Sequence, residues 1–300
     1  MKRFAPEGAL VFAAFLYGST FVIVQDALDD ITPFGYLVIR FATGVLALAP
    51  FAVLALRRMS PATRRLLWRA GAISGALLFV GYATQTVGLQ YTESSTSAFI
   101  TGLYVVFTPM AEAVVRRRFP AGSVCIGIVV ATIGLFFLTG AELGLGRGEW
   151  LTLVCAIAFG VQIMYMGAFA DRLDPIPFTM VQLAMVGLLA VPPTVGTGLG
   201  TLTAAALLAG VFTGIACSSV ALSLQVYGQR RVSPSRAALI LLTEPVFAGI
   251  IGFWNGEDLG GTKLLGAGVI LIGIAIAELA PGRDREDAAA HADLDRSVNG

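Results

Sequence analysis

The feature that constrains this chain most is a succession of ten long, almost uncharged runs separated by short charged or turn-forming segments. A helix rises about 1.5 Å per residue and the hydrocarbon core of a bilayer is about 30 Å thick, so one crossing needs about 20 apolar residues. The sequence therefore predicts an all-α integral membrane protein with ten transmembrane helices. The predicted spans cover about residues 8–25, 34–56, 70–90, 95–115, 121–140, 149–169, 176–197, 202–227, 237–255 and 262–280.

The composition excludes a soluble globular domain. Hydrophobic residues make up 56% of the chain, charged residues only 13%, and the mean hydropathy is +0.81. Soluble domains have about 45–50% apolar and about 25% charged residues. Lys2 and Arg3 precede the first run, but this run is long and no small-residue cleavage site follows it. We therefore expect a retained first helix rather than a signal peptide.

Lys and Arg residues gather at one side of the predicted bundle. That side collects sixteen of the 20, whereas the other side has only Arg147 and Lys263. By the positive-inside rule, we expect both termini in the cytoplasm and a multi-pass protein of the cell inner (plasma) membrane. Residues 281–300 are polar and contain the single histidine, His291. We expect this segment to be a disordered cytoplasmic tail.

The two halves of the chain carry similar residues in the same order. The matches are Gly18 and Pro33 with Gly160 and Pro175, Gln85 and Gly88 with Gln225 and Gly228, Thr108–Pro109 with Glu244–Pro245, and Gly127 and Gly134 with Gly266 and Gly273. Each half has five spans, an odd number, so the second half must enter the membrane inverted. Such repeats are typical of transporters whose midplane site is exposed to each side in turn. We expect a first repeat at 1–141 and a second at 142–280.

The ninth and tenth runs resemble the second-repeat signature of the EamA-type proteins, the ten-helix branch of the drug/metabolite transporter superfamily. The matching elements are Ala237–Ala238, Glu244-Pro245-Val246, Gly256–Glu257 and the pair Gly266 and Gly273; Phe15–Gln25 and Ser94–Pro109 resemble the opening and fourth helices of the family. The resemblance covers about residues 8–280. It implies an exporter of small metabolites such as amino acids or drugs. The acidic residue of the second repeat is not duplicated, because Thr108 stands where the second repeat has Glu244.

No catalytic or metal-binding constellation is visible in the sequence. The predicted spans contain no histidine, and Cys125, Cys155 and Cys217 lie in apolar runs without metal-ligand spacing. We therefore expect no enzyme activity, no metal and no cofactor, with a membrane-embedded enzyme or a channel as alternatives. The expected partners are the lipid bilayer and a small-molecule substrate, not nucleic acid. We expect a monomer or a homodimer.

Polar and aromatic residues at membrane depth are candidates for lining a substrate path. Tyr82 and Gln85 are three residues apart, as are Thr101 and Tyr104, so each pair shares one helix face. Each residue could instead make an interhelical hydrogen bond worth about 0.6 kcal/mol on average. The substrate-binding candidates are Tyr17, Ser19, Tyr82, Gln85, Thr101, Tyr104, Gln162, Tyr165, Ser218 and Glu244, with Thr20 and Ser219 beside them.

Charged residues and prolines within the spans add further hypotheses. An ionised Glu244 near the middle of the ninth span costs on the order of 2.5–3.5 kcal/mol on insertion scales, so it could bind a substrate ammonium, carry a proton or brace the helix, with helix packing as the alternative. Pro109 and Pro245 are predicted helix breaks at matched positions. Arg40 is expected to snorkel to the interface or to pair structurally, and Glu112 to pair with Arg116 one turn later.

The same residues suggest a substrate and an energy source. Four tyrosines and few formal charges favour an amino acid with an aromatic or bulky apolar side chain. The alternative is a cationic or lipophilic drug with Glu244 as its counter-charge. A proton relay usually needs several acidic or histidine residues in the membrane. We therefore favour facilitated diffusion by alternating access over proton coupling through Glu244.

Overall fold

The computed structural model describes residues 5–19, 21–92, 94–117, 121–139, 146–254 and 260–278. Within these ranges the chain is built from helices, and the one extended pairing is an isolated bridge between Ile31 and Gly200. Five helical stretches are long and apolar enough to cross a membrane. They are α3 (Pro33–Arg57), α4 (Pro61–Gly88), α8 (Arg147–Ala170), α9 (Pro175–Thr197), and the continuous stretch of α10 (Ala204–Thr213), the π-helix η2 (Gly214–Ala221) and α11 (Leu222–Gln229).

The remaining predicted spans are shorter or are divided into two helices. The shorter apolar helices are α1 (Ala5–Gly18), α7 (Gly122–Thr139) and α14 (Gly261–Glu278). The divided spans are α1 with α2 (Phe21–Ala27), α5 (Ser94–Gly102) with α6 (Tyr104–Arg116), and α12 (Pro234–Leu241) with α13 (Glu244–Trp254). Each of the ten predicted runs thus has a helix or a divided helix, and the predicted all-α membrane fold is confirmed.

Proline and a capping side chain begin several of these helices. In α3 the first residue is Pro33, and the Thr32 hydroxyl accepts a hydrogen bond from the Gly35 N–H at 3.2 Å. In α4 the first residue is Pro61, and Ser60 caps the helix in the same way. Proline has no N–H to satisfy at this position, and the side-chain oxygen satisfies one of the free amides of the first turn. Short connections therefore suffice between long helices.

The fourth span (α5 and α6) and the ninth span (α12 and α13) are interrupted by breaks of the same kind. The Leu103 N–H bonds to the Ile100 carbonyl and the Thr243 N–H to the Ile240 carbonyl, both three residues back. These are the tight bonds of a short 3₁₀ turn. The ninth break comes directly before Glu244 and Pro245, whereas the fourth comes at Leu103, and Pro109 lies inside α6.

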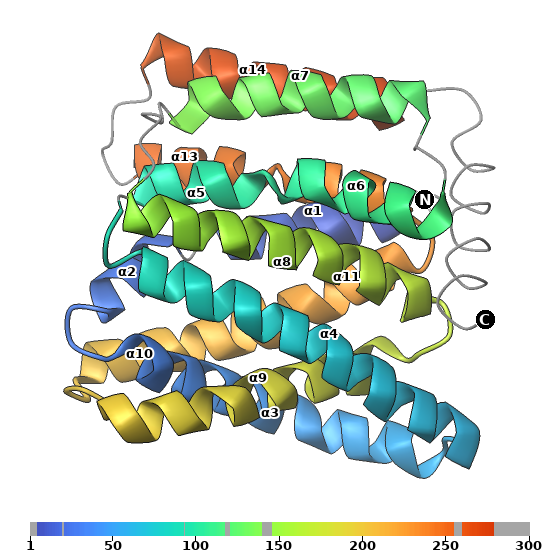
Figure 1. Cartoon of the computed structure of the whole chain (residues 1–300), viewed down its shortest axis with the longest axis vertical. Helices are drawn as coiled ribbons and strands as arrows, with labels where there is room; N and C mark the ends of the chain where they lie inside the picture. The colour runs from blue at the N-terminus through green and yellow to red at the C-terminus, as the bar shows by residue number, and fades with distance from the viewer. Residues whose placement is uncertain are drawn as a thin grey trace.

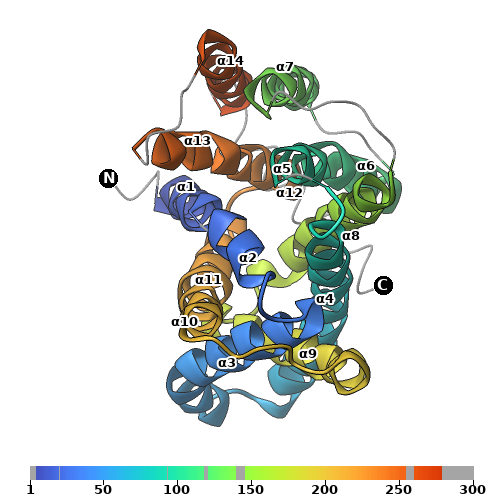
Figure 2. The ribbon, with the colours of Figure 1, turned by 90° about the vertical axis from the view of Figure 1, so that its left-hand side faces the viewer.

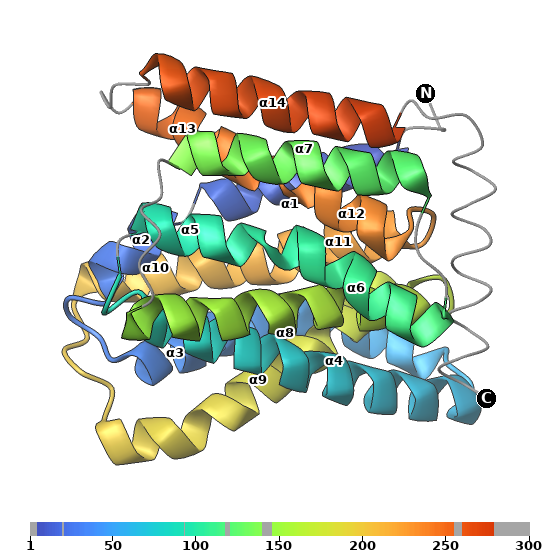
Figure 3. The same cartoon turned by 45° about the horizontal axis from the view of Figure 1, so that its top comes forward.

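This placement of Pro109 differs from the predicted break. A proline ring clashes with the carbonyl four residues earlier, which is that of Val105 for Pro109 and that of Leu241 for Pro245. The break before Glu244 falls within one turn of Pro245, whereas the break at Leu103 lies more than one turn before Pro109, and α6 continues through Pro109. Figure 3 shows α5 and α6 following one another along the same side of the bundle.

Corresponding helices of the two halves pack against each other and run antiparallel. The second helices of the halves, α3 and α9, form one extensive contact, and the fifth helices, α7 and α14, form another. Across the second contact, Gly127 lies against the Gly273 carbonyl and Gly134 against the Gly266 carbonyl. A chain direction that reverses between corresponding helices is what inverted repeats produce.

The glycines of α7 and α14 lie where the two helices cross. A Cβ added at Gly127 would lie 2.5 Å from the Gly273 oxygen, so the two backbones approach more closely than any side chain allows. The crossing joins the two halves of one chain. Figure 1 shows α7 and α14 side by side at one edge, and in the end-on view of Figure 2 they stand outside a ring formed by the other helices.

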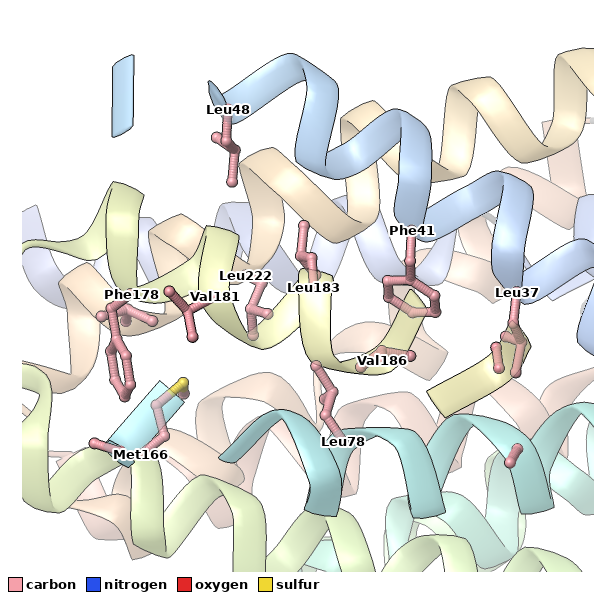
Figure 4. Packing of buried hydrophobic residues seen from close by; sticks show 14 of the residues in the cluster. Leu37, Phe41, Leu48, Leu78, Met166, Phe178, Val181, Leu183, Val186 and Leu222 are labelled. Atoms are coloured by element: carbon pink, nitrogen blue, oxygen red, sulfur yellow. The ribbon is translucent and has the colours of Figure 1, made fainter. Parts of the chain in front are cut away.

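Two clusters of buried apolar side chains hold the bundle together. One lies among α3, α4, α8 and α9, where Leu37 and Phe41 of α3 pack toward Val186 of α9 and Leu78 of α4 (Figure 4). The other lies among α1, α6, α7, α12 and α14. The outer surface is also apolar, since Val114 is 78% exposed and Leu46 71% exposed. In a membrane protein such side chains face lipid.

Candidate functional site

A cavity lies within the ring of helices and is lined by both halves of the chain. Its polar and ionisable lining residues are Tyr17, Arg40, Tyr82, Gln85, Thr86, Thr101, Tyr104, Gln162, Gln225 and Glu244. Its apolar lining residues are Val24, Leu78, Leu89, Phe159, Ile163, Leu222 and Leu241. The volume is about 90 Å³, on a measure in which one water takes about 10–15 Å³. This is room for roughly six to nine waters, or for one solute of amino-acid size.

Most of the predicted substrate-binding residues line this cavity. Tyr17, Tyr82, Gln85, Thr101, Tyr104, Gln162 and Glu244 do so. Ser19, Tyr165 and Ser218 do not line it. The Ser19 hydroxyl donates to the Leu16 carbonyl, and the Tyr165 ring packs on Phe169 with 5.1 Å between centroids. Thr20 lies outside the described residues.

Hydrogen bonds across the cavity wall connect neighbouring helices. The Tyr17 hydroxyl of α1 donates to Gln225 Oε1 of α11 at 3.0 Å. The Gln85 Nε2 of α4 donates to Thr101 Oγ1 of α5 at 3.2 Å. Gln225 was not among our candidates, although it is the repeat partner of Gln85. Its position in the internal repeat was the signal that could have identified it.

One end of the cavity is closed by a buried polar cluster and by tight helix packing. Gln162 Nε2 donates to Gln182 Oε1 at 3.0 Å and to Ser74 Oγ at 3.2 Å, and the Ser74 hydroxyl donates to Gln182 Oε1 at 2.7 Å. These residues join α4, α8 and α9. A Cβ at Gly75 of α4 would lie 2.6 Å from the Gln182 carbonyl, so the two helices leave no passage there.

The cavity extends in the opposite direction. Val24 of α2 and Leu89, which follows α4, line it near the ends of those helices, on the left-hand side of Figure 1. Among the described residues, no lining residue comes from the helix turns at the other end of the bundle. The cavity therefore reaches from the middle of the bundle toward the end that holds the Asp29–Asp30 turn.

Of the two environments expected for Arg40, the structure shows contacts with neighbouring helices and not the interface. Its side chain is only 5% exposed and lines the cavity, so the expected snorkelling to the interface is wrong. The Nε donates to Ser218 Oγ of η2 at 2.9 Å, and the guanidinium carbon lies 4.7 Å from the centroid of the Tyr82 ring. These partners come from α4 and from the second half, so a view of one helix could not reveal them.

Glu244 is the first residue of α13 and lines the same cavity as Arg40. Glu244 is a residue of the second half and Arg40 of the first. In the part of the chain that the structure describes, the two side chains form no ion pair with each other. The cavity therefore holds one acidic and one basic side chain that do not contact each other.

Glu112 makes the predicted contact and one more. Its carboxylate accepts from Arg116 Nη1 at 2.8 Å, which confirms the pair one helical turn apart. It also accepts from the N–H and the hydroxyl of Ser235, at the start of α12. Because Glu112 is 1% exposed and does not line the cavity, it fastens α6 to α12 at the closed end.

Within the described ranges, no three His, Cys, Asp or Glu side chains gather in a way that could hold a metal ion. The free cysteines Cys155 and Cys217 are buried. The cavity offers hydrogen-bonding groups, one acidic and one basic side chain, and aromatic ring faces.

Comparisons with known proteins agree with this architecture. The sequence model of the EamA-like transporter family matches residues 7–140 and again residues 146–279. An uncharacterized transporter of Archaeoglobus fulgidus is 30% identical over 281 residues, which cover 93% of this chain and 87% of that protein. A WAT1-related chloroplastic protein of Arabidopsis thaliana is 25% identical over 298 residues, covering 92% of this chain and 70% of that protein. A crystal structure with 17% identity matches the fold with a TM-score of 0.71, over 90% of this chain and 95% of that one.

Proposed function

This chain belongs to the EamA-like transporter family, and on that premise we propose that it exports amino acids with aromatic or bulky apolar side chains by facilitated diffusion. The observation that carries the proposal is the cavity between the two halves, which combines ring faces, hydrogen-bonding groups, one acidic side chain and one basic side chain. A transport site between inverted repeats is reached from each side in turn when the halves change their relative packing.

The walls of the cavity suit an amino acid. The Glu244 carboxylate supplies a counter-charge for the ammonium group. The rings of Tyr17, Tyr82, Tyr104 and Phe159 provide surfaces for an aromatic or bulky apolar side chain. A tyrosine offers both a ring face and a hydroxyl, so it accommodates an amphipathic solute. The size of the cavity matches one such molecule.

The charge distribution supports a direction for the open end. The cavity reaches toward the end of the bundle that holds Arg147 and Lys263, and the predicted topology puts sixteen Lys and Arg residues on the other, cytoplasmic side. The described conformation is then closed to the cytoplasm at Gln162 and Glu112 and faces outward. Export also requires an inward-facing conformation. In that conformation the contacts of Gln162 and Glu112 separate, and a new seal forms around the outer ends of α2 and α4.

The scarcity of ionisable groups supports facilitated diffusion. Within the described residues, Glu244 is the one carboxylate that lines the cavity. Relays that couple transport to protons use several acidic or histidine residues. Net export is therefore driven by the gradient of the substrate itself.

The experiment that tests the proposal is counterflow in proteoliposomes. Vesicles containing the purified chain are preloaded with one of a panel of unlabelled amino acids and cationic drugs, and entry of the labelled compound is measured. We expect counterflow of phenylalanine, tyrosine and leucine. If cationic drugs show counterflow and no amino acid does, the substrate class is cationic drugs and the proposal is wrong. In a separate electrical recording, single-channel currents far above the turnover of a carrier would indicate a channel.

A further inference from the structure

We propose that Arg40 binds the carboxylate of the transported amino acid and thereby excludes amines that lack this group. The inference rests on the proposed function. It assigns to Arg40 the selection of amino acids over other amines as substrates. Four observations support it: the burial of Arg40, the contacts of its guanidinium, the absence of an ion pair to it among the described residues, and the position of Glu244.

The burial of Arg40 on a cavity wall favours an anionic partner in that cavity. A guanidinium stays charged in proteins, and a charge inside a membrane protein is stable only when it is paired or faces a polar cavity. In the described part of the chain, no carboxylate forms an ion pair with Arg40. The cavity is the place from which a counter-ion can come.

The orientation of the guanidinium leaves donors for that counter-ion. Of its five N–H groups, the Nε group donates to Ser218 Oγ at 2.9 Å and one Nη2 group makes a long contact of 3.5 Å to the Tyr82 hydroxyl. The plane is held over the Tyr82 ring, a cation–π arrangement that fixes its position before a substrate arrives. A guanidinium has more donors than these contacts use, and a carboxylate with its two coplanar oxygens is the group that fits them.

The position of Glu244 extends this argument to the whole substrate. An α-amino acid carries an ammonium and a carboxylate on one carbon. The second repeat contributes the carboxyl group of Glu244 to the cavity, and the first contributes the guanidinium of Arg40. A bound zwitterion therefore joins the two halves that must move relative to each other. A compound with the ammonium alone engages only Glu244 and leaves Arg40 unpaired.

A purely structural role for Arg40 is the competing explanation, because its bond to Ser218 also fastens α3 to η2. A structural role predicts equal losses for all substrates. A carboxylate-binding role predicts a loss that depends on the substrate's carboxyl group. The test must therefore compare substrates as well as variants.

The test is competition for labelled phenylalanine counterflow by unlabelled phenylalanine, phenylalanine amide and phenethylamine. In the wild-type protein, we expect phenylalanine to compete at roughly 10- to 100-fold lower concentration than the amide or the amine, as the loss of charge-assisted hydrogen bonds predicts. This comparison needs no variant. Equal competition by the amide would overturn the inference while leaving the proposed function intact, whereas no counterflow of any amino acid would defeat both.

Variants provide the second arm. In Arg40→Gln, we expect the preference for phenylalanine over its amide to fall to about one, whereas Arg40→Lys should retain part of it. The matched control is Arg57→Gln, the same substitution at the exposed end of the same helix, which should keep the full preference. An Arg40→Gln protein that transports phenylalanine with unchanged preference would show that Arg40 is structural.

Discussion

The crossing of α7 and α14 gives a sharp prediction, because one helix contains both a tightly packed glycine and an open one. A Cβ at Gly266 would lie 2.3 Å from the Leu138 nitrogen and 2.6 Å from the Gly134 oxygen, both backbone atoms that cannot move aside. A Cβ at Gly268, two residues later on α14, meets nothing within 4 Å. The perturbation is therefore alanine at each position in turn.

The magnitude follows from the distances. Ordinary van der Waals contact for a Cβ begins near 3.4 Å, so Gly266→Ala must separate the two helices by about 1 Å. Overpacking of this kind costs typically about 1–3 kcal/mol. Alanine also favours the helix over glycine by about 1 kcal/mol, but this gain applies equally to Gly268→Ala. The difference between the two variants therefore isolates the overpacking, and we expect Gly266→Ala to be less stable than Gly268→Ala by about 1–3 kcal/mol.

The assay is reversible unfolding in detergent micelles, followed by circular dichroism, with the free energy of unfolding compared among the wild-type protein and both variants. We expect Gly268→Ala to be at least as stable as the wild type. Equal free energies for the two variants, within about 0.5 kcal/mol, would refute the claim that this crossing is a close contact between the two repeats.

Three further predictions concern the closed end, the energy source and the orientation. Glu112→Gln should lower the free energy of unfolding by about 1.5–3 kcal/mol, because a buried carboxylate with charged and neutral donors is replaced by an amide; unchanged thermal unfolding would contradict this. With a proton gradient imposed on proteoliposomes, labelled substrate should equilibrate without accumulating; accumulation that Glu244→Gln abolishes would instead establish proton coupling. A cysteine introduced at Arg117 and one at Gly260 should be labelled from opposite sides of the membrane, and labelling from the same side would exclude the ten-span topology.

The helical spans could be predicted from the sequence because their signals are local. Apolar length marks the spans, and Pro33, Pro61 and Pro175 mark the first residues of three helices. The glycine pairs were recognisable because seven residues are two helical turns. The partner of such a face is not a local property, so the pairing of α7 with α14 had to come from the structure.

The cavity was harder to predict than the spans. The spacing of Tyr82 with Gln85 and of Thr101 with Tyr104 placed each pair on one face, and all four line the cavity. The sequence left two environments open for Arg40, because a long cation near a helix end is stable both at the interface and in a polar interior. Ser218 and Tyr82 decide between these environments, and they are 178 and 42 residues away in the chain. Residue type and depth alone could not separate Tyr165, which packs on Phe169, from the tyrosines of the cavity.

The most direct test of the central claim, that this cavity is the transport site for an amino acid, is substrate-protected labelling of one cysteine. In a protein whose native cysteines are replaced, Gln85→Cys places a thiol on the cavity wall, and Thr132→Cys on α7 places the control away from it. We predict that a thiol reagent abolishes phenylalanine counterflow only for Gln85→Cys, and that phenylalanine slows this labelling. Full counterflow after complete labelling of Gln85→Cys would contradict the account.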